Sequence, residues 1–256
     1  MSPLPLKTQT PEEDEIEKKL ADLKSLEIEL VRRELELRTL STQLQVFNAK
    51  YTQAVGHLIL ELDQLEAQIA VLHAQKNPDN RAAQEKARRT WQRPQETEQT
   101  TGAFSEGIVT REFTPSKHIK ELYREAAKLI HPDLITNEQE KNRRSELMAE
   151  ANRAYAEGDE KALKEIIRLW KTRSHAVQGE PISARLIRTI KQIAQVRKRL
   201  EVITEELKRY RSGHLFELFT ENEKAKGEGR DLFGTTALKL TEAIELAKKV
   251  LADMAA

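Results

Sequence analysis

An apolar residue at every seventh position constrains this chain more than any other feature of its sequence. The series runs through Ile16, Leu23, Leu30, Leu37, Leu44, Tyr51, Leu58, Leu65 and Leu72. Heptad spacing of this kind predicts one long helix over 12–75 that packs along a seam. Pro11 and the acidic residues after it favour the start of that helix, and the Asn77-Pro78 pair favours its end. At ~1.5 Å per residue the helix is about 96 Å long, so it requires a packing partner.

The companion apolar residues of this helix follow the heptad positions by three residues in some turns and by four in others. The apolar stripe therefore drifts around the helix, which suits an antiparallel hairpin or a small bundle as well as a parallel coiled coil. The whole chain is 33% charged and 38% hydrophobic, with 5% aromatic residues. It is short of core material for a compact globule, and long helices with narrow apolar stripes fit this balance better.

Several classes of function are disfavoured by the residues that the chain lacks. With no cysteine there is no disulfide, no thiolate zinc site and no cysteine nucleophile. The six histidines include no pair four residues apart, and no glycine-rich phosphate loop is present. We therefore expect no metal, no cofactor and no enzymatic activity of its own. The first residues have no apolar signal core, and no segment approaches the ~18 apolar residues of a membrane span, so a cytoplasmic location is expected.

The remainder of the chain divides into three further segments. Residues 76–112 are polar and predict a short helix over 81–92, with Trp91 exposed, followed by a flexible linker. Residues 113–172 predict a compact helical unit. The segment 182–256 predicts three more helices, over 182–211, 214–226 and 236–254, separated by Ser212-Gly213 and by a turn from Gly227 to Gly234. No strand-like alternation is present, so the predicted fold class is all-α.

Charge is distributed unevenly between the two long predicted helices. Residues 1–80 carry 14 acidic against 9 basic side chains, whereas 182–211 is strongly basic. Two readings fit this pattern: the basic helix pairs with the acidic residues 12–36 of the same chain, or the chain associates with itself through its coiled coils. A nucleic-acid surface on 182–211 is disfavoured because no aromatic side chains interleave with the basic ones.

The helix predicted over 117–130 has two distinct faces. At ~100° per residue, a basic stripe forms on one side from Lys117, Lys120, Arg124 and Lys128. An apolar cluster forms on the opposite side from Ile119, Leu122, Tyr123, Ala126 and Ile130. Pro132 has no N–H to continue the helix and disfavours the α conformation at His131, so helix and stripe end together. One face is therefore expected to pack and the other to face solvent.

A second helix is predicted after the His131-Pro132-Asp133 tripeptide. Asn137 is a suitable N-cap, and Glu140 completes a capping box three residues later. The apolar side of this helix consists of Leu147, Met148, Ala151, Ala154 and Tyr155. We expect an antiparallel pair of helices joined by a short loop, with Tyr123, Met148, Tyr155 and Trp170 in its core and His118 on its surface. His131 is expected to be exposed, so that its replacement has little effect on stability.

This segment resembles the J-domain of DnaJ-type co-chaperones. The resemblance is carried by Tyr123-Arg124, by His131-Pro132-Asp133 and by Asn152-Arg153-Ala154-Tyr155 at the end of the second helix. It implies that the basic face docks on an acidic surface of a DnaK-type heat-shock ATPase and that the tripeptide triggers ATP hydrolysis in that partner. The implied trigger is His131, Pro132 and Asp133, and the implied docking residues are Lys117, Lys120, Arg124 and Lys128.

The chain also departs from the family pattern. The usual first helix is absent, with residues 102–116 in its place, and Glu125 and Leu129 occupy positions where members often carry a base. A cysteine-rich zinc module and a Gly/Phe-rich linker are missing too. The resemblance therefore implies a divergent member with coiled-coil extensions that bind an unknown protein client or partner. The alternative is a coiled-coil scaffold or adaptor whose J-like unit stimulates no ATPase.

Overall fold

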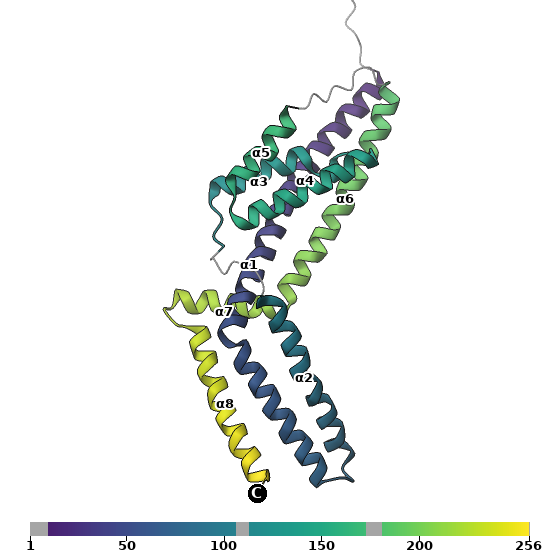
Figure 1. The fold of residues 1–256 in the computed structure, drawn as a ribbon. Coiled ribbons are helices and arrows are strands. Elements are labelled where there is room, and N and C mark those ends of the chain that lie inside the picture. The colour runs from purple at the N-terminus through teal and green to yellow at the C-terminus, as the bar shows by residue number, and fades with distance from the viewer. Residues whose placement is uncertain (1–9, 106–112, 173–180, 256) are drawn as a thin grey trace, which may run out of the picture. The chain divides into compact units, whose positions relative to one another are not determined.

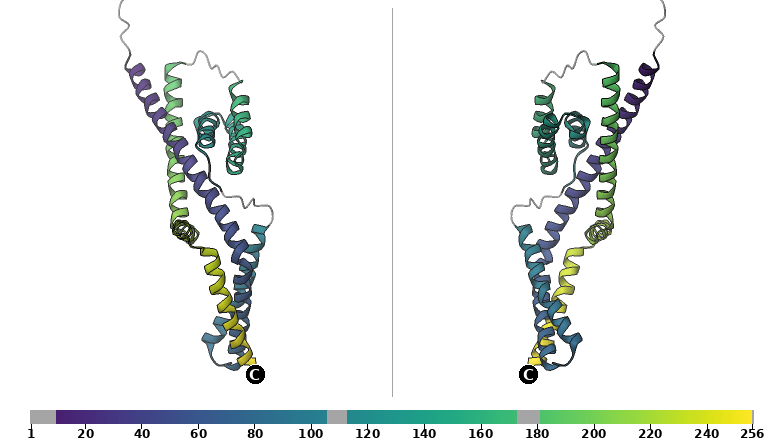
Figure 2. Two further views of the ribbon diagram at one scale, coloured as in Figure 1. Left: turned by 90° about the vertical axis from the view of Figure 1, so that its left-hand side faces the viewer. Right: turned by 90° about the vertical axis from the view of Figure 1, so that its right-hand side faces the viewer.

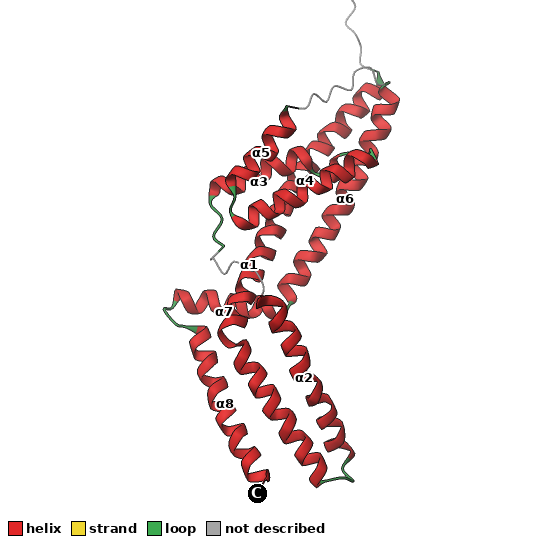
Figure 3. Ribbon diagram, viewed as in Figure 1, coloured by secondary structure: helices red, strands yellow, loops and turns green. Residues whose placement is uncertain are grey.

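The computed structural model describes residues 10–105, 113–172 and 181–255, and over these ranges every regular element is a helix (Figures 1 and 3). The α-helices are α1 (Pro11–Lys76), α2 (Arg81–Ser105), α3 (Lys117–Ile130), α4 (Glu138–Glu157), α5 (Glu160–Lys171), α6 (Ile182–Ser212), α7 (His214–Gly227) and α8 (Leu232–Ala255). A short 3-10 helix, η1 (Pro132–Leu134), follows α3. The predicted all-α class is confirmed. Within the described ranges, no helix combines the length and the apolar character that a membrane crossing needs.

Helix α2 is longer than the sequence predicted. A short helix over 81–92 and a flexible linker were expected, but the helix continues through Pro94 to Ser105. Its packing explains the difference, because α2 runs antiparallel to α1 and is bonded to it along its length. Arg93 Nη1 lies 3.3 Å from Glu66 Oε2, and the Thr97 hydroxyl donates to Asp63 Oδ2 at 2.7 Å. A tertiary partner of this kind stabilises a polar helix that would be marginal alone. Residues 106–112 of the expected linker lie outside the described residues.

The chain forms two compact units, and α1 contributes to both. The first unit contains the described residues up to Thr42 together with Phe113–Arg211, and the second contains those of Gln43–Glu112 and Ser212–Ala256. This division crosses the middle of α1, whereas the sequence suggested four consecutive segments. Each half of α1 therefore has its own set of neighbours.

In the first unit, α1 and α6 lie side by side and run in the same direction (Figure 2). Their shared core consists of Leu23, Leu30 and Leu37 from α1 with Ile193, Val196, Ile203 and Leu207 from α6. Arg211 Nη2 lies 2.6 Å from Glu36 Oε1, and the Ser41 and Tyr210 hydroxyls are 3.3 Å apart. Of the two alternatives, pairing of the basic helix with the acidic one within the chain is confirmed, and self-association stays a prediction. The apolar Ile190 of α6 is exposed and lies outside this core.

Helices α3, α4 and α5 pack together in the same unit. Tyr123, Tyr155 and Leu163 are fully buried in their core, and Met148 and Trp170 are buried there as predicted. Side chains cap the start of each helix: Ser116 for α3, Asn137 for α4 and Asp159 for α5. Gly158 ends α4 in the left-handed conformation, with a φ of 75°. Glycine adopts this conformation with little steric strain because it has no Cβ. His118 is exposed, as expected.

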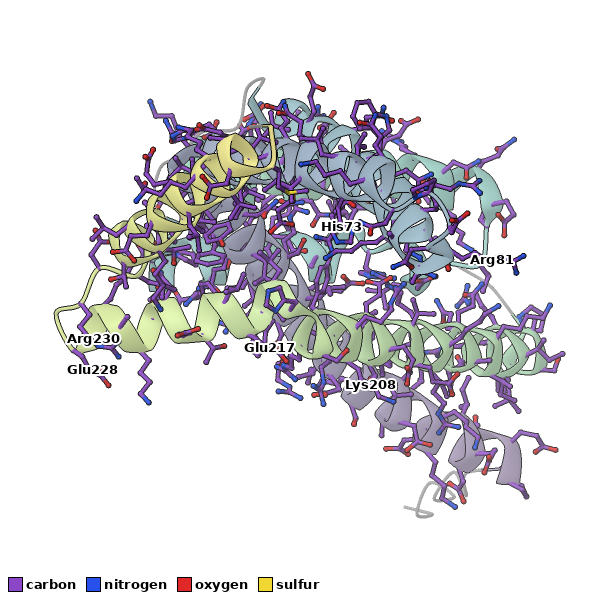
Figure 4. All side chains as sticks on the ribbon, turned by 90° about the horizontal axis from the view of Figure 1, so that it is seen from below. His73, Arg81, Lys208, Glu217, Glu228 and Arg230 are labelled. Atoms are coloured by element: carbon purple, nitrogen blue, oxygen red, sulfur yellow. The ribbon has the colours of Figure 1, made fainter. Side chains whose placement is uncertain are left out.

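The second unit contains the rest of α1 with α2, α7 and α8. Small side chains form the α1–α2 contact: Ala70, Ala74, Ala83 and Ala87. An aromatic cluster joins α1 to α7 and α8, with the Phe47 ring centroid 5.6 Å from Phe219 and 5.7 Å from Phe233. Between α7 and α8 the chain turns at Gly229, which has a φ of 70°. Arg230 Nε donates to Glu228 Oε2 at 2.8 Å across this turn (Figure 4).

Candidate functional site

The His-Pro-Asp loop, which comprises these three residues and Leu134 (residues 131–134), begins where α3 ends. His131 adopts an extended conformation, with φ −61° and ψ 128°, as expected for a residue before proline. The Asp133 N–H donates to His131 Nδ1 at 3.1 Å, and the Leu134 N–H donates to the His131 carbonyl at 3.2 Å. Because Nδ1 accepts a hydrogen bond, the ring proton is assigned to Nε2. The loop is therefore a short, internally bonded bend with a defined histidine orientation.

The prediction that His131 is exposed is wrong. The residue is 2% exposed, and its Nε2 lies 3.1 Å from Oε1 of Glu34 on α1. The bend that Pro132 imposes favours exposure of His131 only where no other element packs over it. The loop is covered by a segment almost one hundred residues away in the sequence. Replacement of His131 would therefore remove a buried, hydrogen-bonded side chain, so the reason for expecting little effect on stability no longer applies.

Glu34 lies at the centre of a buried polar cluster with His131 and Arg199, here called the Glu34 cluster. Arg199 Nε on α6 donates to the same oxygen, Oε1, at 2.7 Å. Burial raises the pKa of the Glu34 carboxyl, but the hydrogen bonds from His131 and Arg199 outweigh burial and leave the pKa below its ordinary value. Burial lowers the pKa of the Arg199 guanidinium, and the bond to Glu34 reverses this, so that pKa is raised. Both groups are thus charged.

The position of Glu34 on α1 follows from two apolar faces of that helix. Leu30 packs toward α6, and Val31 packs into the core of α3–α5. At ~100° per residue, Glu34 lies about 40° from Leu30 and about 60° from Val31, and so between the two faces. Leu35 extends the second face by one turn. The heptad pattern predicted the first face only, although the apolar pair Val31 and Leu35, four residues apart, was a signal for the second.

Two further side chains hold the loop. On α6, the Gln192 amide donates to the Leu134 carbonyl at 2.8 Å. On α4, Arg144 Nη1 donates to the His131 carbonyl at 3.4 Å, and its guanidinium lies 4.8 Å from the Trp170 ring centroid. Burial lowers the pKa of Arg144. The loop is therefore fixed from α1, α6 and α4 together.

Asp133 is the more accessible of the two polar side chains in the loop. Its side chain is 21% exposed, against 3% for that of His131. Asp133 also lies close enough to Arg199 to contribute to the raised pKa of that guanidinium. Pro132, which lies between His131 and Asp133 in the sequence, is half-buried. Of the three residues assigned to the trigger, only His131 is removed from solvent.

The basic residues of α3 lie where the sequence predicted, on the side away from the core. Lys117, Arg124 and Lys128 are exposed and Lys120 is half-buried. Lys117 Nζ is 4.0 Å from Glu121 Oε1, a surface pair of the kind that contributes little to stability. At the other end of the stripe, burial raises the pKa of Glu27 on α1 and the positive charge of Lys128 opposes this rise. The stripe thus begins in solvent and ends beside acidic α1.

The tyrosines and the asparagine of the motif have structural roles that explain their spacing. The Tyr123 hydroxyl donates to Asn152 Oδ1 at 2.7 Å and so ties α3 to α4. The Tyr155 hydroxyl lies 2.8 Å from the Thr39 hydroxyl, and Arg38 Nε donates to the Asn152 carbonyl at 3.2 Å, both from α1. Burial raises the pKa of Tyr123 and of Tyr155. Helix α1 is therefore bonded to the end of α4 as well as to the loop.

No group of histidine and carboxylate side chains in the described ranges is arranged to hold a metal ion. Comparison of the chain with protein-family models, with curated proteins and with solved structures found no match.

Proposed function

We propose that this protein is a co-chaperone of the J-domain type, which docks on a DnaK-type ATPase and stimulates its ATP hydrolysis. The observation that carries the proposal is the His-Pro-Asp loop at the exit of a helix with one basic and one buried face. The helix after the loop packs back on the first through the Tyr123–Asn152 hydrogen bond. A chance tripeptide would not be accompanied by both of these features.

In this proposal the parts of the unit have separate roles. Lys117, Lys120, Arg124 and Lys128, of which all but the half-buried Lys120 are exposed, steer and bind an acidic surface of the partner, since surface charges act chiefly on encounter. The His-Pro-Asp loop then acts on the bound ATPase. The chain performs no chemistry of its own and holds no cofactor. Its long helices bind a protein client or partner, and the proposal includes a cytoplasmic location.

The second candidate is a coiled-coil scaffold or adaptor whose J-like unit stimulates no ATPase. One observation favours this candidate: the buried His131 side chain is hydrogen-bonded to Glu34 of the same chain. In that case the tripeptide serves only to end α3 and to bind α1, and it has no role toward a second protein. The two candidates differ in whether the loop acts on a second protein.

Single-turnover ATP hydrolysis by a DnaK-type ATPase separates them. We expect the full chain to accelerate hydrolysis and Asp133→Asn to remove most of the acceleration. Asp133 is the better test residue because it is partly exposed and its isosteric replacement keeps the loop's shape. Asp253→Asn, on the exposed surface of α8, is the matched control and should behave as wild type. Absence of acceleration by both the wild-type chain and Glu34→Ala, which removes the carboxylate bonded to His131, would favour the scaffold.

Docking is tested by reversing charge on the basic stripe. Lys120→Glu with Arg124→Glu should slow association with the ATPase, with an effect that shrinks as salt rises. The control reverses the exposed Arg197 and Lys198 on α6, which gives the same change in net charge away from the stripe. Association rates measured at low and high salt decide the question. Equal rates for the two double variants at low salt would exclude the stripe as the docking face.

A further inference from the structure

We propose that α1 and α6 mask the His-Pro-Asp loop, so that this chain docks on its partner in a closed form and stimulates it only after the two helices move off the loop. This inference rests on the proposed function and adds its regulation. The mask consists of contacts that Glu34, Arg199 and Gln192 make with the loop or with each other.

The His131 side chain, the proposed trigger, is already hydrogen-bonded within the chain. His131 is 2% exposed and both of its ring nitrogens have partners inside the chain, Glu34 at Nε2 and the Asp133 N–H at Nδ1. A side chain in this state has no free donor or acceptor for a second protein. The Glu34 carboxylate would have to leave before Nε2 could bond elsewhere.

The residues that cover the loop come from helices other than α3, α4 and α5. Glu34 belongs to α1, and Arg199 and Gln192 belong to α6. The Leu134 side chain packs against the apolar seam between those two helices, and its carbonyl accepts from Gln192. Withdrawal of α1 and α6 would therefore expose the whole face of the loop in one movement, while Arg144 of α4 would still hold the His131 carbonyl.

Three of the four docking residues are exposed while the loop is closed. Lys117, Arg124 and Lys128 are exposed in the same structure that buries His131. Binding and triggering are therefore separable here. The closed chain should bind the ATPase through its basic stripe, with an association rate that falls as salt rises. It should stimulate hydrolysis only weakly, because only the open fraction of molecules exposes the loop.

A reversible cross-link tests the mask directly, and the absence of cysteine makes the chemistry clean. Leu134→Cys with Gln192→Cys, joined by a short cleavable bismaleimide, fastens the loop to α6, since the Gln192 amide lies 2.8 Å from the Leu134 carbonyl. We expect stimulation to fall at least ~10-fold when cross-linked and to return on cleavage. The control is Ser41→Cys with Tyr210→Cys, which joins α1 to α6 away from the loop. It should leave stimulation unchanged.

Histidine footprinting measures the mask without any ATPase. Diethylpyrocarbonate should modify His131 slowly in the wild-type chain, with the exposed His118 and His214 as internal references. Glu34→Ala should speed modification of His131 and increase stimulation. Glu36→Ala is the matched control, because it removes another α1 carboxylate paired with an α6 arginine but does not touch the loop.

The outcomes separate failure of the mask from failure of the function. Stimulation that is equal for the cross-linked, cleaved and Glu34→Ala chains would overturn the mask and leave the co-chaperone proposal standing. Wild-type His131 that reacts as fast as His118 would overturn the mask as well. If His131 becomes reactive in Glu34→Ala and none of the chains stimulates the ATPase, the proposed function fails, and the regulation that rests on it fails with it.

Discussion

The two halves of α1 carry the same heptad repeat but bury different residues. In the first unit the heptad positions Leu23, Leu30 and Leu37 are buried against α6. In the second unit Leu58 and Leu65 are only half-buried. Near the start of that unit α1 still buries the heptad residue Leu44, together with Phe47 and Val55, but beyond Val55 the α1 side chains removed from solvent are small, at Ala67, Ala70 and Ala74. The same heptad repeat therefore packs through leucines against α6 in the first unit, whereas α1 packs through alanines against α2 in the second.

The difference shows that the partner helix decides which face of a long helix is buried. Helix α6 presents large apolar side chains to the heptad leucines, whereas α2 presents Ala83 and Ala87 to the alanines of α1. Alanine seams allow close approach of two helix axes but bury little apolar area per residue, so each residue contributes less free energy. The first unit combines a larger apolar core with the buried Glu34 cluster. It should be the unit in which single substitutions have the larger effects.

The largest expected effect is that of Leu30→Ala. Leu30 is fully buried, and its truncation should lower the free energy of unfolding by about 3–5 kcal/mol. Leu65→Ala, at the same heptad phase of the same helix, removes a half-buried side chain and should cost about 1–2 kcal/mol. Urea unfolding followed by circular dichroism compares them. Equal losses would mean that both halves of α1 use the heptad seam alike.

The Glu34 cluster should give the next largest effect. Glu34→Ala leaves Arg199 and His131 without their shared acceptor and should cost about 2–4 kcal/mol. Glu36→Ala breaks a more exposed α1–α6 ion pair and should cost at most about 1 kcal/mol. The same unfolding experiment measures both. A cluster of no structural importance would give losses that agree within error.

A smaller effect is expected at the alanine seam of the second unit. Ala74→Gly should lower the free energy of unfolding by about 1 kcal/mol, mostly through the greater backbone freedom of glycine. Ala194→Gly, at an exposed position of α6, measures the loss of unfolding free energy that comes from backbone freedom alone. The difference between the two substitutions measures the packing of the seam. A difference of several kcal/mol would contradict the idea that each alanine contributes little.

The smallest effect is a dependence of stability on pH. The pKa of Glu34 lies below its ordinary value of 4.5, so the folded chain binds fewer protons there than the unfolded chain. The stabilisation is complete above that value and is lost as pH falls through the lower, folded pKa. The advantage of the wild type over Glu34→Gln should therefore shrink from pH 6 to pH 3. A constant difference over that range would mean that the carboxylate charge has no part in stability.

Local signals in the sequence were enough to predict much of this fold. Pro11 and Asn77-Pro78 fixed the limits of α1 to within a residue or two, and Asn137 capped α4 as expected. The length of α2 was missed because its polar sequence is stabilised by α1 rather than by its own residues. The His-Pro-Asp loop was placed correctly at the helix exit. Its burial could not be predicted, since it depends on Glu34 and Arg199, which are distant in sequence and are brought together only by folding.

The most direct test of the account is single-turnover ATP hydrolysis by a DnaK-type ATPase with two variants of the full chain. In Glu34→Ala the loop is released, and hydrolysis should be faster than with the wild-type chain. In Glu34→Ala combined with Asp133→Asn the same release exposes an altered loop, and the acceleration should disappear. Circular dichroism of both variants verifies that the helices are retained. If the two variants accelerate hydrolysis equally, or if neither does, the His-Pro-Asp loop is not the trigger that the account requires.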